Sequence, residues 1–127
     1  MKPRMSLLLA CLALALPAGA HHSGAAFDRN KSITVVGAVN SVEWTSPHAR
    51  LKIDAKDEAG ALVTWDFELP SPVTLTRRGW SKTALVPGDK ITVTGAPARE
   101  HPHIAIATGV IDKSGKRLFS GAANSTE

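Results

Sequence analysis

Two neighbouring segments alternate strictly between apolar and polar residues, and this feature most constrains the fold. Residues 50–55 read RLKIDA and residues 63–69 read VTWDFEL, so every second side chain is apolar in both. A period of two is typical of a β-strand with one buried face. The residues between them, 56–60, read KDEAG and form a turn. The sequence therefore predicts a β-hairpin at the centre of the chain.

The flanking segments extend this all-β pattern. Upstream, Ile33, Val35 and Val39 share one face, whereas Val42 and Trp44 fall on the other. This change of phase beside Gly37 predicts a bulged and sharply bent strand. Downstream, the pattern predicts strands near 91–95, 104–110 and 117–119.

One short helix is predicted between the third and fourth strands. Ser71 supplies a capping hydroxyl, Pro72 suits the first helical position, and Gly79 ends the helix. The order of elements favours a small all-β fold, a five- to six-stranded OB-like Greek-key barrel whose helix closes one end. A simple β-sandwich is the alternative.

The first twenty residues have the composition of a secretory signal peptide. Lys2 and Arg4 precede an uncharged apolar run at 7–16, and Ala18-Gly19-Ala20 offers a cleavage site between Ala20 and His21. An uncleaved membrane anchor fits these residues less well than a cleaved signal peptide, because ten apolar residues are too few to span a bilayer. A lipoprotein signal with a lipid-modified Cys11 also fits less well, because the apolar run continues beyond that cysteine.

Cleavage changes the composition that matters for function. The remaining chain has no cysteine, which excludes a disulfide framework and cysteine-based zinc sites. Two of the 15 basic residues depart and all 11 acidic ones stay, leaving a formal charge of +2. We therefore expect a periplasmic or secreted protein with no nucleic-acid partner and no further transmembrane segment. The expected organisation is a signal peptide at 1–20, a barrel domain with an extended N-terminal lead-in at 21–121, and a flexible tail at 122–127.

The five histidines all follow the predicted cleavage site. If His21 becomes the first residue, its amine and ring nitrogen can chelate one metal ion together, and a further histidine such as His48 would complete a copper site. His22 can contribute its ring or its amide nitrogen. The alternative is a solvated chain end without a ligand. Copper is the first expectation and zinc the second.

His101 and His103 form a second candidate metal pair. In an extended segment, residues two apart point to the same side, so both rings could hold one ion. A polar loop leading into the fifth strand is the preferred alternative.

Four further residues are candidates for a ligand or partner surface: Trp44, Glu68, Arg77 and Trp80. Asp66 and Glu68 lie on the polar face of the third strand, where carboxylates are usually solvated. Trp80 is expected to pack into the barrel end, and Arg77 to pair with a carboxylate such as Glu68. No nucleophile triad, phosphate loop or zinc-protease motif is present, so the sequence does not indicate an enzyme.

The chain resembles a family of small exported bacterial proteins, mostly proteobacterial, that is classed as a domain of unknown function. The resemblance rests on His21-His22-Ser23, residues 43–48 (EWTSPH), Glu68, Ser71-Pro72, Leu75, Arg77, Gly79-Trp80, Leu85, 87–89 (PGD) and 91–93 (ITV). The family usually has Asn where this chain has Ser46, and residues 99–103 match none of its motifs. The resemblance implies a secreted β-rich domain similar to OB-fold proteins, with His21, His22 and His48 as shared functional positions.

Three hypotheses for function follow from these observations. The first is an exported binding protein with a histidine-lined metal site. The second is an OB-like interaction module that binds a small molecule, glycan or envelope protein without metal. The third, a copper-dependent oxidoreductase, is the least supported because catalytic patterning is lacking.

Overall fold

The computed structural model describes residues 26–121 of the chain. The predicted signal peptide, its cleavage bond, His21, His22 and the predicted tail at 122–127 lie outside the described residues. Among the described residues, no helix is both long enough and apolar enough to span a bilayer.

Six strands and one helix make up the described chain. In order they are β1 (Ile33–Glu43), β2 (Arg50–Lys56), β3 (Leu62–Glu68), α1 (Pro72–Arg77), β4 (Lys90–Pro97), β5 (Ile104–Asp112) and β6 (Arg117–Ser120). The hydrogen-bonded order across the sheet is β3-β2-β1-β4-β5-β6, and neighbours in this order are antiparallel.

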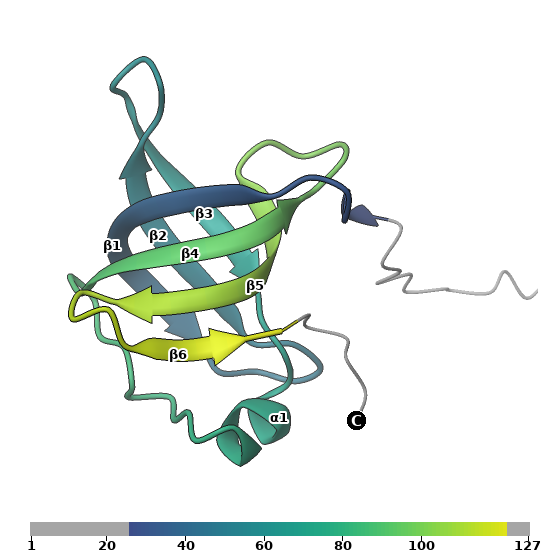
Figure 1. Cartoon of the computed structure of the whole chain (residues 1–127), viewed down its shortest axis with the longest axis vertical. Helices are drawn as coiled ribbons and strands as arrows, with labels where there is room; N and C mark the ends of the chain where they lie inside the picture. Colours follow the sequence, from purple (N-terminus) through teal and green to yellow (C-terminus); the bar gives the residue numbers. More distant parts are fainter. Residues whose placement is uncertain (1–25, 122–127) are drawn as a thin grey trace, which may run out of the picture.

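One further pairing closes the sheet into a barrel. The end of β3 lies parallel to the start of β5, with Asp66 opposite Ile104 and Glu68 opposite Ile106. Five strands thus form a closed mixed barrel, and β6 extends it along the other half of β5 (Figure 1). The predicted OB-like barrel is confirmed, including a short helix between β3 and β4.

The bent strand β1 pairs with two neighbouring strands. Its first half pairs with β4 from Ile33 to Ala38, and its second half pairs with β2 from Ala38 to Glu43. The register shifts between Val39 and Ser41, so the predicted bulge is confirmed a few residues after Gly37. A bulge increases the local bend, which lets one strand cross from one side of the barrel to the other.

The helix closes one end of the barrel as predicted. The Ser71 hydroxyl accepts a hydrogen bond from the Thr74 backbone N–H at 3.2 Å, and Gly79 follows the helix with a φ of +84°. Both are ordinary helix-end devices. Leu75 on the helix and Trp80 and Leu85 after it are buried in the main core. Figure 1 shows α1 below the barrel, across its lower end.

The interior of β5 is lined by small residues. Ala105 and Ala107 belong to the core, whereas Ile106 is fully buried but lies outside the core cluster, on the opposite face of the strand. Opposite them on β4, a Cβ at Gly95 would lie 2.5 Å from the Ile106 carbonyl oxygen. The barrel wall is therefore closely packed where β3, β4 and β5 meet, which is where Glu68 lies.

Candidate functional site

His48 is held at the junction of two strands, just before β2. The next residue, Ala49, donates its backbone N–H to Pro70 at 3.2 Å and accepts from Leu69 at 2.9 Å, so the chain around His48 is tied to the end of β3. The His48 Nδ1 lies 3.2 Å from the Leu69 carbonyl oxygen. A carbonyl oxygen only accepts, so Nδ1 must carry the hydrogen in this bond. In the neutral ring, the lone pair is then on Nε2.

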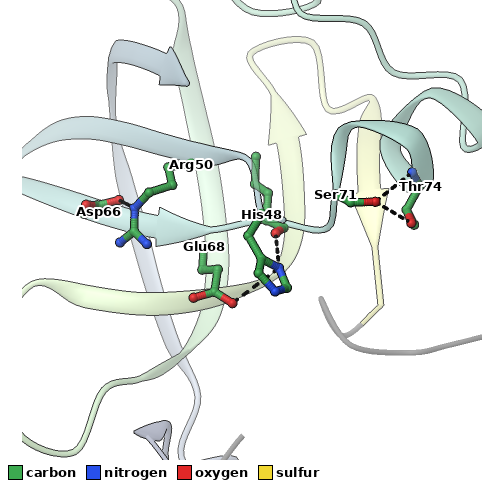
Figure 2. Close-up of polar contacts among 7 residues, drawn as sticks. His48, Arg50, Asp66, Glu68, Ser71 and Thr74 are labelled. Carbon is green, nitrogen blue, oxygen red and sulfur yellow. Dashed lines mark hydrogen bonds and ion pairs between the residues drawn. The ribbon is translucent and has the colours of Figure 1, made fainter. Parts of the chain in front are cut away.

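Glu68 lies beside this histidine. Figure 2 shows its carboxylate pointing toward the His48 ring. The Oε1 is 3.5 Å from His48 Nδ1, and the residue is only 5% exposed. Arg50 on β2 and Ile106 on β5 are its register neighbours and flank it. The expectation of a solvated carboxylate is therefore wrong for Glu68. Residues on the neighbouring strands cover Glu68, and the alternating pattern within one strand does not predict such contacts.

The rest of this outer face carries paired charges. The Arg50 Nε donates to Asp66 Oδ1 at 2.9 Å, and the Lys52 Nζ donates to Glu43 Oε1 at 2.6 Å. Burial is the largest single influence and acts to lower the pKa of Arg50, but the hydrogen bond with Asp66 and the charges of Asp66, Glu68 and Glu43 together raise it overall. The hydrogen bond with Glu43 raises the pKa of Lys52, and the same bond lowers the pKa of Glu43. Arg50, Lys52 and Glu43 therefore keep their charges at neutral pH, and each lies against a group of opposite charge.

The geometry of His48 suits a metal ligand. Metal-bound histidines commonly donate the second ring N–H to a carbonyl or carboxylate, which orients the ring and sets the tautomer. Around His48, the Leu69 carbonyl oxygen is in the acceptor position, and the Glu68 carboxylate lies 3.5 Å from the same nitrogen. Within residues 26–121, however, no cluster of three or more His, Cys, Asp or Glu is placed to hold a metal ion. Further donors would have to come from outside that range.

The structure does not present His101 and His103 as a pair on an extended strand. The segment turns at 102–103, and His103 has a left-handed φ of 59°. The premise of an extended segment is therefore wrong, and the preferred alternative, a polar loop leading into the fifth strand, is confirmed. His101 is exposed, whereas the His103 ring packs edge-on against Trp65, with centroids 5.1 Å apart.

The remaining surface candidates are placed as follows. Trp80 is 5% exposed and lies in the core. Its expected packing into the barrel end is therefore confirmed, and it is not part of a ligand surface. Trp44 is half-buried and packs against the core from the loop after β1. Arg77 is exposed at the end of α1. Its expected ion pair with Glu68 is not formed, because Glu68 lies against His48 instead.

A groove that the sequence did not predict lies at the end of the barrel opposite α1. It has a volume of about 440 Å³ and lies between the first half of β1 and the tip of the β2–β3 hairpin. Its lining residues are Ile33, Thr34, Val35, Val36, Ala55, Lys56, Asp57, Glu58, Trp65 and His103. The sequence signal for it was Trp65, at an apolar position in the middle of β3, and such a position is equally typical of a core residue.

Comparison with known proteins gives one match. A model described as a family of unknown function (DUF6152) matches residues 8–107 of the chain. No curated protein and no solved structure matches it.

Proposed function

The chain therefore belongs to the DUF6152 family, whose function is unknown, and we propose that it is an exported protein that binds a divalent metal ion through histidines. His48 is one ligand in this proposal, and His21 and His22 supply the others. Copper is favoured over zinc. The protein is proposed to bind rather than to catalyse, since its described surface offers no acid, base and nucleophile arrangement.

One observation carries the proposal. The His48 Nδ1–H points at the Leu69 carbonyl oxygen, 3.2 Å away, with Glu68 close behind. This contact orients the ring with Nε2 as its basic nitrogen, and a nearby buried carboxylate makes the imidazole a stronger donor. A histidine that served only to hydrogen-bond the loop would not need the carboxylate.

The chain end is long enough to bring its histidines to His48. Ala26 accepts a hydrogen bond from the Arg99 backbone at 2.9 Å, so the described chain starts beside the end of β4. Across the strands, three spacings of about 4.8 Å separate that point from Glu68, and along the strands about three residues of rise, so the diagonal distance is about 17 Å. The five residues from Ala26 back to His21 can span about 17 Å when extended. The side chains of His21 and His48 add further reach.

The expected donors explain the preference for copper. A free amine and imidazole nitrogens in one site suit Cu(II), which binds such ligands more tightly than the other divalent first-row metals do. The amine becomes available only if the leader is removed between Ala20 and His21. When bound, the ion would supply a Lewis acid or a one-electron couple. The role of this chain is to hold it.

Copper titration of the exported protein tests the proposal. Mass spectrometry first determines whether the mature chain starts at His21. We expect one tight site, weakened by orders of magnitude by one extra residue before His21 or by His48→Ala. The exposed His101→Ala is the matched control and should leave the affinity unchanged. Equal affinity with and without the extra residue would refute the proposal.

A second variant tests the supporting carboxylate. Glu68→Gln keeps the size of the side chain and removes its charge. Losing a carboxylate behind a metal-bound histidine typically weakens affinity by about 10- to 100-fold. If the Gln variant binds copper as tightly as the parent protein, Glu68 has no part in the site.

The second candidate is an interaction module that binds a small molecule, glycan or envelope protein without metal. The five-strand barrel favours it, because OB-type barrels bind ligands on the outer face of the second and third strands. Arg50 and Asp66 lie on that face here. Binding to a glycan panel should then survive replacement of all five histidines by alanine. Turnover of a redox substrate by the copper-loaded protein would instead support the third candidate, an oxidoreductase.

A further inference from the structure

The barrel wall has an open seam beside the first half of β1. Pairing between β1 and β2 begins only at Ala38 opposite Asp54, and from Ile33 to Gly37 the one strand paired with β1 among the described residues is β4. The β2–β3 hairpin continues past this point and extends beyond β1 (Figure 1). The groove of about 440 Å³ lies in this seam.

On the seam side, the first half of β1 has backbone groups with no partner strand among residues 26–121. Val39 donates its N–H to Asp89 and accepts from the Gly88 N–H, both at 2.8 Å, so both of its groups point toward β4. Along an antiparallel strand, residues direct these groups alternately to one neighbour and to the other. The backbone N–H and C=O groups of Val35 and Gly37 therefore point toward β4, whereas those of Thr34 and Val36 point into the seam.

The walls of the groove combine an apolar floor with an acidic rim. Trp65, Ile33 and Val35 supply apolar surface, and Trp65 is held in place by a stacking contact with Phe67 at 5.8 Å. At the hairpin tip, Asp57 and Glu58 contribute two carboxylates against the single ammonium group of Lys56. Their excess negative charge favours a basic side chain in whatever occupies the groove.

The seam also leaves exposed an apolar side chain that a folded domain often covers. Val36, on the edge of β1 that has no partner strand among the described residues, is 67% exposed. Unpaired strand edges are usually protected by charge, proline or a covering segment, because they recruit other strands. Residues 33–37 carry an exposed valine and neither charge nor proline, which is the arrangement of an edge that receives a partner strand.

We propose that the open seam between β1 and the β2–β3 hairpin binds an extended peptide of a partner protein. The peptide adds to β1 as a strand and forms backbone hydrogen bonds with Thr34 and Val36. One apolar side chain lies against Trp65, and one Lys or Arg lies near Asp57 and Glu58. This site is separate from His48 and its function requires no metal.

Selection from a random nonapeptide phage library, carried out with chelator present, tests this inference. The purified protein is the target, and Val36→Pro is the counter-target, because proline removes the Val36 N–H donor. Val36→Thr is the matched control, because it keeps that donor. Enriched peptides should alternate apolar and polar residues and carry a basic residue. They should bind Val36→Pro about tenfold more weakly and Val36→Thr within about twofold, as expected for one backbone hydrogen bond.

A modified peptide keeps the test decisive if Val36→Pro folds poorly. N-methylation of single amides in an enriched peptide should reduce affinity about tenfold at alternate positions only, because only those amides face β1. Hydrogen exchange at Thr34 and Val36 should slow when the peptide binds. The inference is overturned if no peptide is enriched, or if no N-methylated peptide loses affinity. Either result leaves the copper titration unaffected.

Discussion

Truncating Leu75 should remove most of the packing that holds α1 across the barrel end. Leu75 is the only buried residue of this helix, and it is fully buried. A helix of six residues is too short to be stable alone, so its stability comes from tertiary contacts. The helix should therefore depend on this side chain more than on any other it contains.

The expected cost follows from the burial. Leu75→Ala deletes three carbon atoms, and at about 0.8 kcal/mol for each buried methylene the transfer loss is about 2.4 kcal/mol. The cavity left between the helix and the barrel raises the cost to about 3–4 kcal/mol. This would be a large fraction of the stability of a domain of this size.

Urea unfolding followed by tryptophan fluorescence measures the effect, since Trp80 is buried in the same cluster. Val73→Ala is the matched control. Val73 lies on the same helix but is 58% exposed, so its truncation should change the free energy of unfolding by less than about 0.5 kcal/mol. The reasoning is refuted if Leu75→Ala costs less than about 1.5 kcal/mol, or if both variants cost the same.

Three further predictions concern the barrel wall and its ends. Gly95→Ala should destabilise the protein strongly in thermal unfolding, because the new Cβ would lie 2.5 Å from the backbone oxygen of Ile106, which cannot move aside. Asp54 should contribute to acid unfolding. Its pKa is lowered by hydrogen bonds from Asn40 and from a threonine of β3. Its stabilising contribution is therefore complete above the unfolded-state pKa and is lost as the pH falls through the folded-state pKa. Asp54→Asn should therefore flatten the dependence of stability on pH below about pH 4. Ser71→Ala should cost about 1 kcal/mol in urea unfolding, because its hydroxyl caps the first turn of α1.

Local patterns in the chain were sufficient to predict most elements. The alternation in 50–55 and 63–69 gave the hairpin, because a strand with one buried face requires period-two burial. The cap at Ser71 and the left-handed Gly79 bounded the helix, because both act within one turn of the backbone. The bend in β1 was predictable for the same reason: a change of phase between apolar faces is a local property.

The site beside His48 was predictable only in part. His48 was a candidate from its residue type, and this remains a proposal. Its partner Glu68 lies twenty residues away, and nothing local indicates that β2 and β5 both flank that carboxylate. The same limit explains why Arg77 was assigned to Glu68, whose neighbour in the fold is His48. It also explains the error at His103, which has a left-handed φ of 59° in a turn whose ring contact is with Trp65 on β3.

By itself, then, the sequence determined which segments are strands, where the helix begins and ends, and that the fold is all-β. Those properties depend on interactions within a few residues. Only the tertiary structure decided how β3 meets β5, that Glu68 is buried against His48, and that β1 and β2 part beside Gly37 to leave an open seam. These features arise when strands far apart in the chain become neighbours, and no local periodicity or helix cap specifies which distant strands will pair.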